Sequence, residues 1–332
     1  MLDPLLHPVP KKALRRVRLL WVVAGILLFV GYHYGYVARA AVPTLTGSLS
    51  RETLRVGDRE RTFAYYAPAS LPPHPPLLIA FHGSGQTGES FRARTGYAFD
   101  RVADSVGFVL VYPDGYENHW NDCRKAASFS ARALRIDDVG FVRAIIAHLT
   151  SKLGVDPGRV FATGHSNGGS MCYRVAQEMA GEIAGVVPIS ASMPVPENND
   201  CHDNGQAISV LVMNGTDDPI DPYGGGHETI FGFADRGYVL SSVDTALYFA
   251  KKNGLAGAPV VERLAGGDSS LWVERSTWGS QGAEQAVLDT IHGGGHAVPQ
   301  PYAPYPRILG RTDLAFNGPA EIWRFFAEQP RR

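Results

Sequence analysis

Short runs of apolar residues recur along the chain, and they alternate with segments in which apolar residues repeat every three or four positions. The runs are typical of strands in a buried sheet, and the periodic segments predict amphipathic helices. Strands are expected at residues 61–67, 77–81, 107–112, 160–162, 185–189, 208–213, 271–277 and 286–291. Helices are expected at residues 90–105, 137–153, 171–180, 241–253 and 319–327.

This alternation of strands and helices predicts right-handed βαβ units. The expected fold class is therefore α/β, with a mostly parallel, doubly wound sheet and helices on both of its faces. Residues 41–60 read as a polar lead-in, and no internal repeat, low-complexity tract or linker follows residue 41. We therefore expect residues 41–332 to form a single domain.

The first 40 residues differ from the rest of the chain and have the pattern of an export signal. A basic segment precedes the apolar run Leu19–Val30, and the tripeptide Ala38-Arg39-Ala40 offers a small-x-small cleavage site. One alternative is an uncleaved membrane anchor through residues 19–37, with its basic end in the cytoplasm. Another is a buried core helix. The basic residues are Lys11, Lys12, Arg15, Arg16 and Arg18.

Residues 41–332 carry 25 basic and 31 acidic side chains, a net charge of −6 with neutral histidines. This balance gives no indication of a nucleic-acid partner. No metal site is expected, because the chain has no C-x-x-C motif. The pair His292 and His296 lies in a glycine run rather than on a helix.

Three cysteines, Cys123, Cys172 and Cys201, follow the expected signal, so an oxidising compartment would allow one disulfide. Cys172 falls in an expected helix, where it reads as a buried, small apolar residue. By elimination, the expected disulfide joins Cys123 to Cys201.

The motif G-x-S-x-G occurs at residues 164–168, between an expected strand and an expected helix. In that context it predicts a nucleophile elbow, the sharp turn that presents the catalytic serine of an α/β-hydrolase. Glycines on both sides of Ser166 allow the turn without a clash from a Cβ atom. The backbone N–H of Asn167, at the start of the helix, is then a candidate donor to an oxyanion.

The acid of such a triad follows a later strand. After the strand 208–213 the chain offers Asp217, Asp218 and Asp221. Any of the three could orient an imidazole and stabilise the imidazolium that forms during catalysis.

The histidine comes last in the chain order of the triad. After the strand 286–291, three glycines separate His292 from His296. The glycines allow the loop to fold back toward the elbow, so His296 is the expected base. His292 adjoins the strand and is expected to be structural.

A second oxyanion donor is expected from the loop that follows the strand 77–81. That loop begins His82-Gly83-Ser84-Gly85, and we expect the backbone N–H of Ser84 to be the donor. His82 is expected to be a hydrogen-bonded structural residue rather than a second base.

Seven stretches distributed over most of the chain match the pattern of one protein family. The chain resembles the secreted polyhydroxybutyrate depolymerases and feruloyl esterases, a carbohydrate-esterase-like group of α/β-hydrolases. The stretches are FHGSGQTG from Phe81, VYPDG from Val111, WNDC from Trp120, DDVGF from Asp137, GHSNGG from Gly164, NGTDDPIDPYGGG from Asn214 and GGGH from Gly293.

The resemblance implies particular roles for three residues. Ser166 matches the family's nucleophile, and His296 matches the histidine that ends the glycine run. The family's acid is the fifth residue of the stretch that begins at Asn214, which selects Asp218. In relatives with the WNDC stretch, a cysteine near the position of Cys201 also recurs, which supports the expected disulfide.

The chain departs from the family pattern in two places. Residues 297–299, Ala-Val-Pro, follow the final histidine where the family often has an aromatic residue, so contacts of the acyl pocket cannot be transferred. No separate polymer-binding domain or threonine-rich linker is present in the sequence, which argues against attack on solid polyester.

These patterns predict an exported serine ester hydrolase that works through an acyl-enzyme and needs no cofactor. The resemblance implies a polyhydroxybutyrate-type oligoester or a feruloyl or other phenolic ester as substrate. Trp120 and Tyr223 could form an aromatic wall for a phenolic acid, or they could pack as core or lid. The alternatives are an oligopeptidase-like serine peptidase and a non-catalytic, membrane-anchored binding protein on a hydrolase scaffold.

Overall fold

The computed structural model describes residues 11–38, 40–264 and 269–332. The chain divides into two units, Met1–Ala38 with Pro306–Ile308 and Arg39–Tyr305 with Leu309–Arg332. The first unit contains helix α1 (Lys11–Gly35). Within the described ranges, no helix has both the length and the apolarity that crossing a membrane requires. The alternative of a membrane anchor through residues 19–37 is therefore not confirmed.

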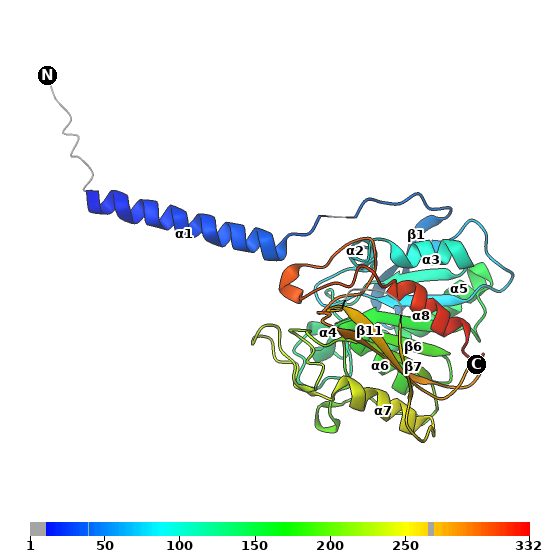
Figure 1. Ribbon diagram of the computed structural model, residues 1–332. Coiled ribbons are helices and arrows are strands. Elements are labelled where there is room, and N and C mark those ends of the chain that lie inside the picture. The colour runs from blue at the N-terminus through cyan, green and yellow to red at the C-terminus, as the bar shows by residue number, and fades with distance from the viewer. Residues whose placement is uncertain (1–10, 39, 265–268) are drawn as a thin grey trace. The chain divides into compact units, whose positions relative to one another are not determined.

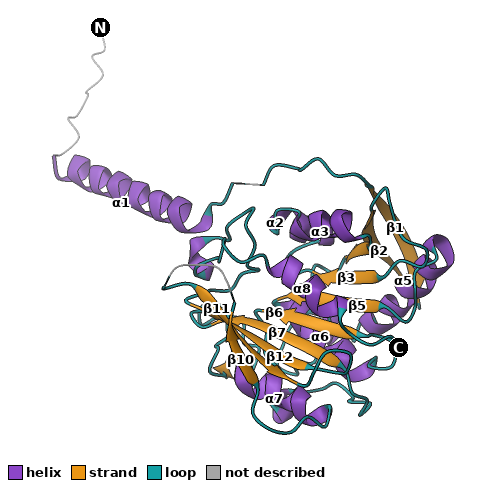
Figure 2. Cartoon of the chain, turned by 45° about the vertical axis from the view of Figure 1, so that its right-hand side comes forward, coloured by secondary structure: helices purple, strands orange, loops and turns teal. Residues whose placement is uncertain are grey.

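Within its described residues, the second unit is built on one ten-stranded sheet, drawn in orange in Figure 2. The strand order is β1-β2-β4-β3-β5-β6-β7-β12-β11-β10. The strands are β1 Ser48–Val56, β2 Arg59–Ala67, β3 Leu77–Phe81, β4 Val109–Pro113, β5 Val160–His165, β6 Gly185–Ile189, β7 Ser209–Gly215, β10 Val260–Arg263, β11 Trp272–Trp278 and β12 Ala286–His292, with β8 Gly226–His227 and β9 Tyr238–Val239 in a separate pair.

The middle of the sheet, from β4 to β12, is parallel, and both edges are antiparallel. This confirms the expected mostly parallel sheet. Strands β1 and β10 were not expected from the sequence. Both are edge strands with many exposed positions, so they lack the apolar runs that mark the interior strands.

Helices cover both faces of the sheet (Figure 1). Buried side chains of α5, α6 and α7 pack in one core cluster, and those of α2, α3 and α8 pack in the other. The helices of this unit are α2 Gly88–Arg94, α3 Ala98–Val106, α4 Ser130–Ala133, α5 Asp138–Leu153, α6 Asn167–Glu178, α7 Ser242–Lys252 and α8 Gly318–Ala327, with a short 3-10 turn at Pro196–Asn198. A second 3-10 turn, Arg307–Leu309, begins among the residues of the first unit.

The helix expected across residues 90–105 is in fact two helices, α2 and α3. Gly96 and Tyr97 between them have φ angles of +62° and +59°, which no α-helix contains. The helix expected from residue 137 is confirmed as α5, and the side chain of Asp137 caps it by accepting the N–H of Gly140.

The expected functional residues follow strands that lie close together in the sheet. Ser166 follows β5, which pairs with β3, and Ser84 lies three residues after β3. Asp218 and His296 follow β7 and β12, which pair with each other. Because these four strands are parallel, their carboxyl ends lie at one edge of the sheet, the usual place for a ligand site in an α/β protein.

Candidate active site

Ser166 lies at a sharp turn between β5 and α6. Its backbone is strained, with φ +58° and ψ −122°, and its N–H donates to the carbonyl of Ile189 at 2.9 Å. A Cβ atom on Gly164 would lie 2.3 Å from the carbonyl oxygen of Gly168. A Cβ on Gly168 would lie 2.3 Å from the carbonyl oxygen of Phe81. Neither position can therefore hold a larger residue without displacement of the backbone, as the elbow motif predicts.

Asp218 and His296 form a buried pair. His296 Nδ1 lies 2.8 Å from Asp218 Oδ2, and both side chains are almost fully enclosed. The other carboxylate oxygen of Asp218 accepts the backbone N–H groups of Ile220 and Asp221, at 2.8 and 2.9 Å. These bonds fix the carboxylate, and the carboxylate in turn fixes the tautomer and orientation of the imidazole. Asp217 lies elsewhere, with its side chain bound to the hydroxyl of Thr216.

The protein environment raises the pKa of His296 above its ordinary value in water. Burial lowers the pKa of His296, whereas the charge and hydrogen bond of Asp218 raise it. The net shift of the pKa is upward. The His296 ring packs 4.8 Å from the ring of His165, the residue before Ser166. Among the described residues, no hydrogen bond joins Ser166 to His296. Catalytic hydrogen bonds of this kind often tighten only when substrate is bound.

The remaining histidines near the elbow have structural contacts. His82 donates from Nδ1 to the carbonyl of Gly83, and its Nε2 accepts the N–H of Gly115, both at 2.8 Å. Burial lowers the pKa of His82 to about 4, so its ring is neutral. His292 stacks on Trp272 with 3.9 Å between ring centres. These contacts agree with the structural roles expected for His82 and His292.

The loop after β3 leaves one backbone N–H open. The N–H of Gly83 donates to the side chain of Gln86 at 3.1 Å, and that of Gly85 donates to the carbonyl of Asn118 at 2.9 Å. Between them, the N–H of Ser84 has no acceptor among the described residues. The backbone N–H of Asn167, at the start of α6, likewise has no acceptor among the described residues. Both expected oxyanion donors are therefore available to a ligand.

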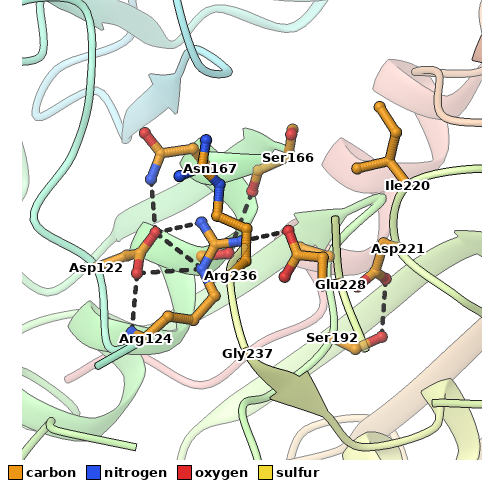
Figure 3. A network of polar contacts seen from close by, with 12 residues as sticks. Asp122, Arg124, Ser166, Asn167, Ser192, Ile220, Asp221, Glu228, Arg236 and Gly237 are labelled. Atoms are coloured by element: carbon orange, nitrogen blue, oxygen red, sulfur yellow. Dashed lines mark hydrogen bonds and ion pairs between the residues drawn. The ribbon is translucent and has the colours of Figure 1, made fainter. Parts of the chain in front are cut away.

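The side chain of Asn167 is held rigidly by the segment between β4 and α4. Its Oδ1 accepts the N–H of Trp120 at 2.8 Å, and its Nδ2 donates to Asp122 Oδ2 at 2.6 Å (Figure 3). These two bonds hold the Asn167 side chain at the start of α6, next to its backbone N–H. This is the kind of pre-organisation that an oxyanion donor requires.

Asp122 belongs to a buried charge cluster with Arg124 and Glu228 (Figure 3). The Arg124 guanidinium binds the Asp122 carboxylate through two nitrogens and also contacts Glu228. All three side chains are nearly inaccessible to solvent. Burial would lower the pKa of Arg124, but its two carboxylate partners raise the pKa well above its ordinary value. The cluster was not expected from the sequence, although the WNDC stretch contains Asp122.

Asp221 is the third aspartate of the loop after β7, and it does not contact His296. Its Oδ2 accepts the hydroxyl of Ser192 at 2.9 Å, while Oδ1 is buried without a partner. Burial raises the pKa of Asp221 well above its ordinary value, and nearby Glu228 and Asp218 raise it further. Among the described residues, the carboxylate that contacts the imidazole of His296 is that of Asp218.

Trp120 and Tyr223, for which the sequence left a substrate wall or core packing open, both have protein partners. Trp120 is fully buried, and its indole N–H donates to the carbonyl of His82 at 2.9 Å. Of the two alternatives that the sequence left open for Trp120, these contacts favour core packing. Tyr223 is partly buried, and its hydroxyl lies 2.6 Å from the hydroxyl of Thr290 on β12.

A disulfide joins Cys123 to Cys201, with 5.0 Å between the Cα atoms. Cys172 is a free, buried thiol, as expected from its place in a helix. Cys123 lies between Asp122 and Arg124, so the disulfide ties the buried charge cluster to a distant part of the chain.

Comparison with known proteins identifies relatives with named activities. No family model matches the chain. It is 30% identical over 285 residues to the "Putative esterase NocK" of Nocardia uniformis subsp. tsuyamanensis, a match that covers 82% of this chain and 80% of that protein. It is 24% identical to feruloyl esterase C of Emericella nidulans, covering 76% and 80% respectively. It is 28% identical to feruloyl esterase B of Piromyces equi, where it covers 67% of this chain but only 39% of the relative.

The fold is similar to that of a solved esterase. The acetyl xylan esterase from Aspergillus awamori superposes with a TM-score of 0.52 at 18% sequence identity, over 76% of this chain and 95% of that one. At that identity the likeness supports the fold, and the sequence relatives support the activity. The chain is thus a carboxylic ester hydrolase, and it belongs to the feruloyl esterase-like family of α/β-hydrolases.

Proposed function

We propose that Ser166, His296 and Asp218 are the catalytic triad of this esterase. The observation that carries the proposal is the buried bond between Asp218 and His296 Nδ1, which leaves Nε2 as the ring nitrogen for proton transfer. The neighbouring His165 ring places this imidazole beside the strained turn that holds Ser166. The chain order serine, acid, histidine is that of an α/β-hydrolase.

The reaction follows from these positions. Ser166 Oγ attacks the ester carbonyl while His296 Nε2 takes the hydroxyl proton, and the carbonyl π electrons move to the oxygen. That oxyanion accepts the N–H groups of Asn167 and Ser84. When the tetrahedral intermediate collapses, the carbon–oxygen bond to the alcohol breaks, and His296 protonates the departing alcohol. The serine is then esterified to the acyl group.

The second half of the reaction, hydrolysis of the acyl-enzyme, repeats the steps of the first half with water as the nucleophile. His296 removes a proton from water as it attacks the acyl-enzyme, and then returns that proton to Ser166 as the acid departs. Asp218 stays ionised throughout and stabilises the imidazolium at each stage. Loss of one oxyanion donor in such a site typically costs about 10²–10³ in kcat.

The proposed substrate is a hydroxybutyrate-type oligoester or a phenolic ester such as a ferulate. The feruloyl esterases among the named relatives support the phenolic ester. The segment between β8 and β9 also carries exposed aromatic side chains, Phe231 and Phe233, which are 43% and 78% accessible. Exposed rings of this kind are suited to contact an apolar or aromatic acyl group.

Export is the proposed route for the catalytic unit, with residues 1–40 as its signal. The basic segment, the apolar run and the small-x-small tripeptide support this. The disulfide between Cys123 and Cys201 supports it as well, because such bonds persist in oxidising compartments.

A small ester panel tests the proposed function. The substrates are p-nitrophenyl acetate and butyrate, methyl ferulate and linear 3-hydroxybutyrate oligomers, with Ser166→Ala as the inactive variant. Exposed Ser105 on α3 supplies the matched control, Ser105→Ala. We expect Ser166→Ala to abolish turnover without a change in folding, and Ser105→Ala to retain it. Full activity of Ser166→Ala would refute the triad, and preference within the panel separates the two substrate classes.

A further inference from the structure

Arg236 lies beside the buried charge cluster on the segment between β8 and β9. The backbone N–H of Arg236 donates to the backbone carbonyl of Glu228 at 3.0 Å, and the backbone N–H of Glu228 donates to the carbonyl of Gly237 at 2.9 Å. These bonds continue the short β8–β9 ladder by one step. Only 6% of Arg236 is accessible, so its side chain is directed inward.

Three arginines in the described part of the chain are buried, and Arg236 differs from the other two. Arg61 contacts Asp138 at 2.6 Å, and Arg124 contacts two carboxylates. The guanidinium of Arg236 lies over the ring of Phe129, 3.9 Å from its centre, and within the described residues it has no hydrogen-bond acceptor or carboxylate contact. Burying a guanidinium without such partners is costly.

One face of this guanidinium is covered by a ring, and its edge has no hydrogen-bond acceptor among the described residues. Within the described residues, none of its nitrogens is both fully enclosed and without a partner. Phe129 covers one face of the guanidinium, and His119 stacks on Phe129 with 4.3 Å between ring centres. An edge that is open while a face is covered presents the planar N–H fork to an incoming group.

Arg236 is also close to the proposed nucleophile. It interacts electrostatically with Asp122, whose carboxylate is bonded to Asn167, the residue after Ser166. Figure 3 shows the Arg236 side chain extending from the segment before β9 toward Asn167 and Ser166. A group bound to Arg236 would therefore be part of a molecule whose ester lies at the elbow.

The surrounding charges limit what this group can be. Burial and the nearby Arg124 lower the pKa of Arg236, whereas Glu228, Asp122 and Asp235 raise it, and an arginine stays protonated under any of these influences. Both Asp122 and Glu228 bond to Arg124, so within the described residues the N–H fork of Arg236 has no carboxylate partner. That fork matches a carboxylate, which it can bind through two hydrogen bonds.

We propose that Arg236 binds a free carboxylate on the ester substrate. The proposal rests on the proposed function and narrows its substrate class. A linear hydroxy-acid oligoester has such a group, because the alcohol that leaves is itself a carboxylic acid. Methyl ferulate has none. The substrate class that this site favours is therefore an ester of a hydroxy acid with its carboxylate free.

A matched substrate pair tests this. The 3-hydroxybutyrate dimer and its terminal carboxamide share the same ester bond and differ only in the charge of the far end. We expect wild-type kcat/KM to favour the acid by about 10- to 100-fold, the range typical of a charged hydrogen bond. Arg236→Gln should remove that preference, and Arg236→Lys should keep part of it.

The control variant is Arg263→Gln. Arg263 also lies over an aromatic ring, 4.3 Å from the centre of Trp272, but it belongs to the exposed edge strand β10. Arg263→Gln should leave the ratio of kcat/KM for the acid to kcat/KM for the amide unchanged. Equal wild-type rates for acid and amide, with p-nitrophenyl acetate still hydrolysed, would overturn the carboxylate site and leave the esterase intact. Loss of p-nitrophenyl acetate hydrolysis in the wild type would instead overturn the proposed function.

A second measurement decides the question if Arg236→Gln does not fold. Competitive inhibition of wild-type p-nitrophenyl acetate hydrolysis is compared for 3-hydroxybutyrate and 3-hydroxybutyramide. Inhibition at least about tenfold stronger by the acid supports the site. Equal inhibition by the two compounds, or none by either, contradicts it.

Discussion

Two buried carboxylates near Ser166 are held in different ways. In the loop after β7, Asp218 is bound by a histidine and two backbone N–H groups. Between β4 and α4, Asp122 is bound by Arg124, whose charge is permanent, and by the side chain of Asn167. The partner of Asp218 is an imidazole, which can gain and lose a proton, whereas the partner of Asp122 is a guanidinium, which stays charged. The comparison suggests that the first region carries the chemistry and the second carries the geometry of the elbow.

The largest expected effect comes from removing the charge in the first region. Asp218→Asn should reduce kcat by about 10³–10⁴-fold, because a neutral amide cannot stabilise the imidazolium. Thermal unfolding should change little, since an asparagine oxygen can still accept the two backbone N–H groups. Steady-state ester hydrolysis measures the loss. Asp217→Asn, which alters an adjacent aspartate that does not touch His296, should retain full activity. Similar losses in both variants would contradict the assignment of Asp218.

In the second region the expected effect is on stability. Arg124→Met leaves Asp122 and Glu228 buried without their shared cation, so the free energy of unfolding should fall by about 3–5 kcal/mol. Urea unfolding measures this fall. The control is Arg143→Met, which breaks an exposed pair with Glu182 and should cost about 0–1 kcal/mol. Comparable losses in the two variants would show that the buried cluster is not a structural anchor.

The disulfide should contribute less than the charge cluster that it adjoins. Replacing both Cys123 and Cys201 with alanine should lower the free energy of unfolding by about 2–4 kcal/mol, because it releases a constraint on the unfolded chain. Thermal unfolding with and without a thiol reductant provides the control. Reductant should destabilise the wild type and leave the double variant unchanged. A wild type that is insensitive to reductant would argue against the bond between these cysteines.

The smallest expected effect is a shift in pH dependence. His296 must be neutral to act as the base. Because its environment raises its pKa above the ordinary value of about 6.5, wild-type activity should decline as the pH drops below that raised pKa. Asp218→Asn removes the charge that raises this pKa, so the residual activity should extend to lower pH. The measurement is kcat/KM against pH for both proteins. If the fall in activity at low pH occurred at the same pH in Asp218→Asn as in the wild type, or at a higher pH, the proposed pairing of Asp218 with His296 would be contradicted.

Much of the fold could be predicted because interior strands have a clear pattern. The apolar run at residues 77–81 is matched residue for residue by β3, and the helix expected to begin at residue 137 is α5. The misses have physical causes. Strands β1 and β10 lie at the edges with little burial, and the break between α2 and α3 depends on positive φ angles at Gly96 and Tyr97.

The candidate site was less accessible to sequence reasoning. Motif and chain order indicated Ser166 and His296, and the resemblance selected Asp218 from three aspartates. Hydrophobic periodicity could not indicate that Arg124 and Arg236 are buried, because charged residues are normally exposed. Their burial depends on contacts between segments more than 100 residues apart, such as Arg124 with Glu228. For Trp120 the sequence left two alternatives, since an aromatic residue near a site fits a substrate wall or a core equally well.

The central claim is that Ser166 is the nucleophile of this esterase. A fluorophosphonate probe that reacts with activated serines tests it most directly, with the labelled residue located by mass spectrometry of the digested protein. We expect one label, on the peptide that contains Ser166, with little labelling of Ser166→Ala and slow labelling of Asp218→Asn. A label on a different serine, or an equally labelled Ser166→Ala variant, would contradict it.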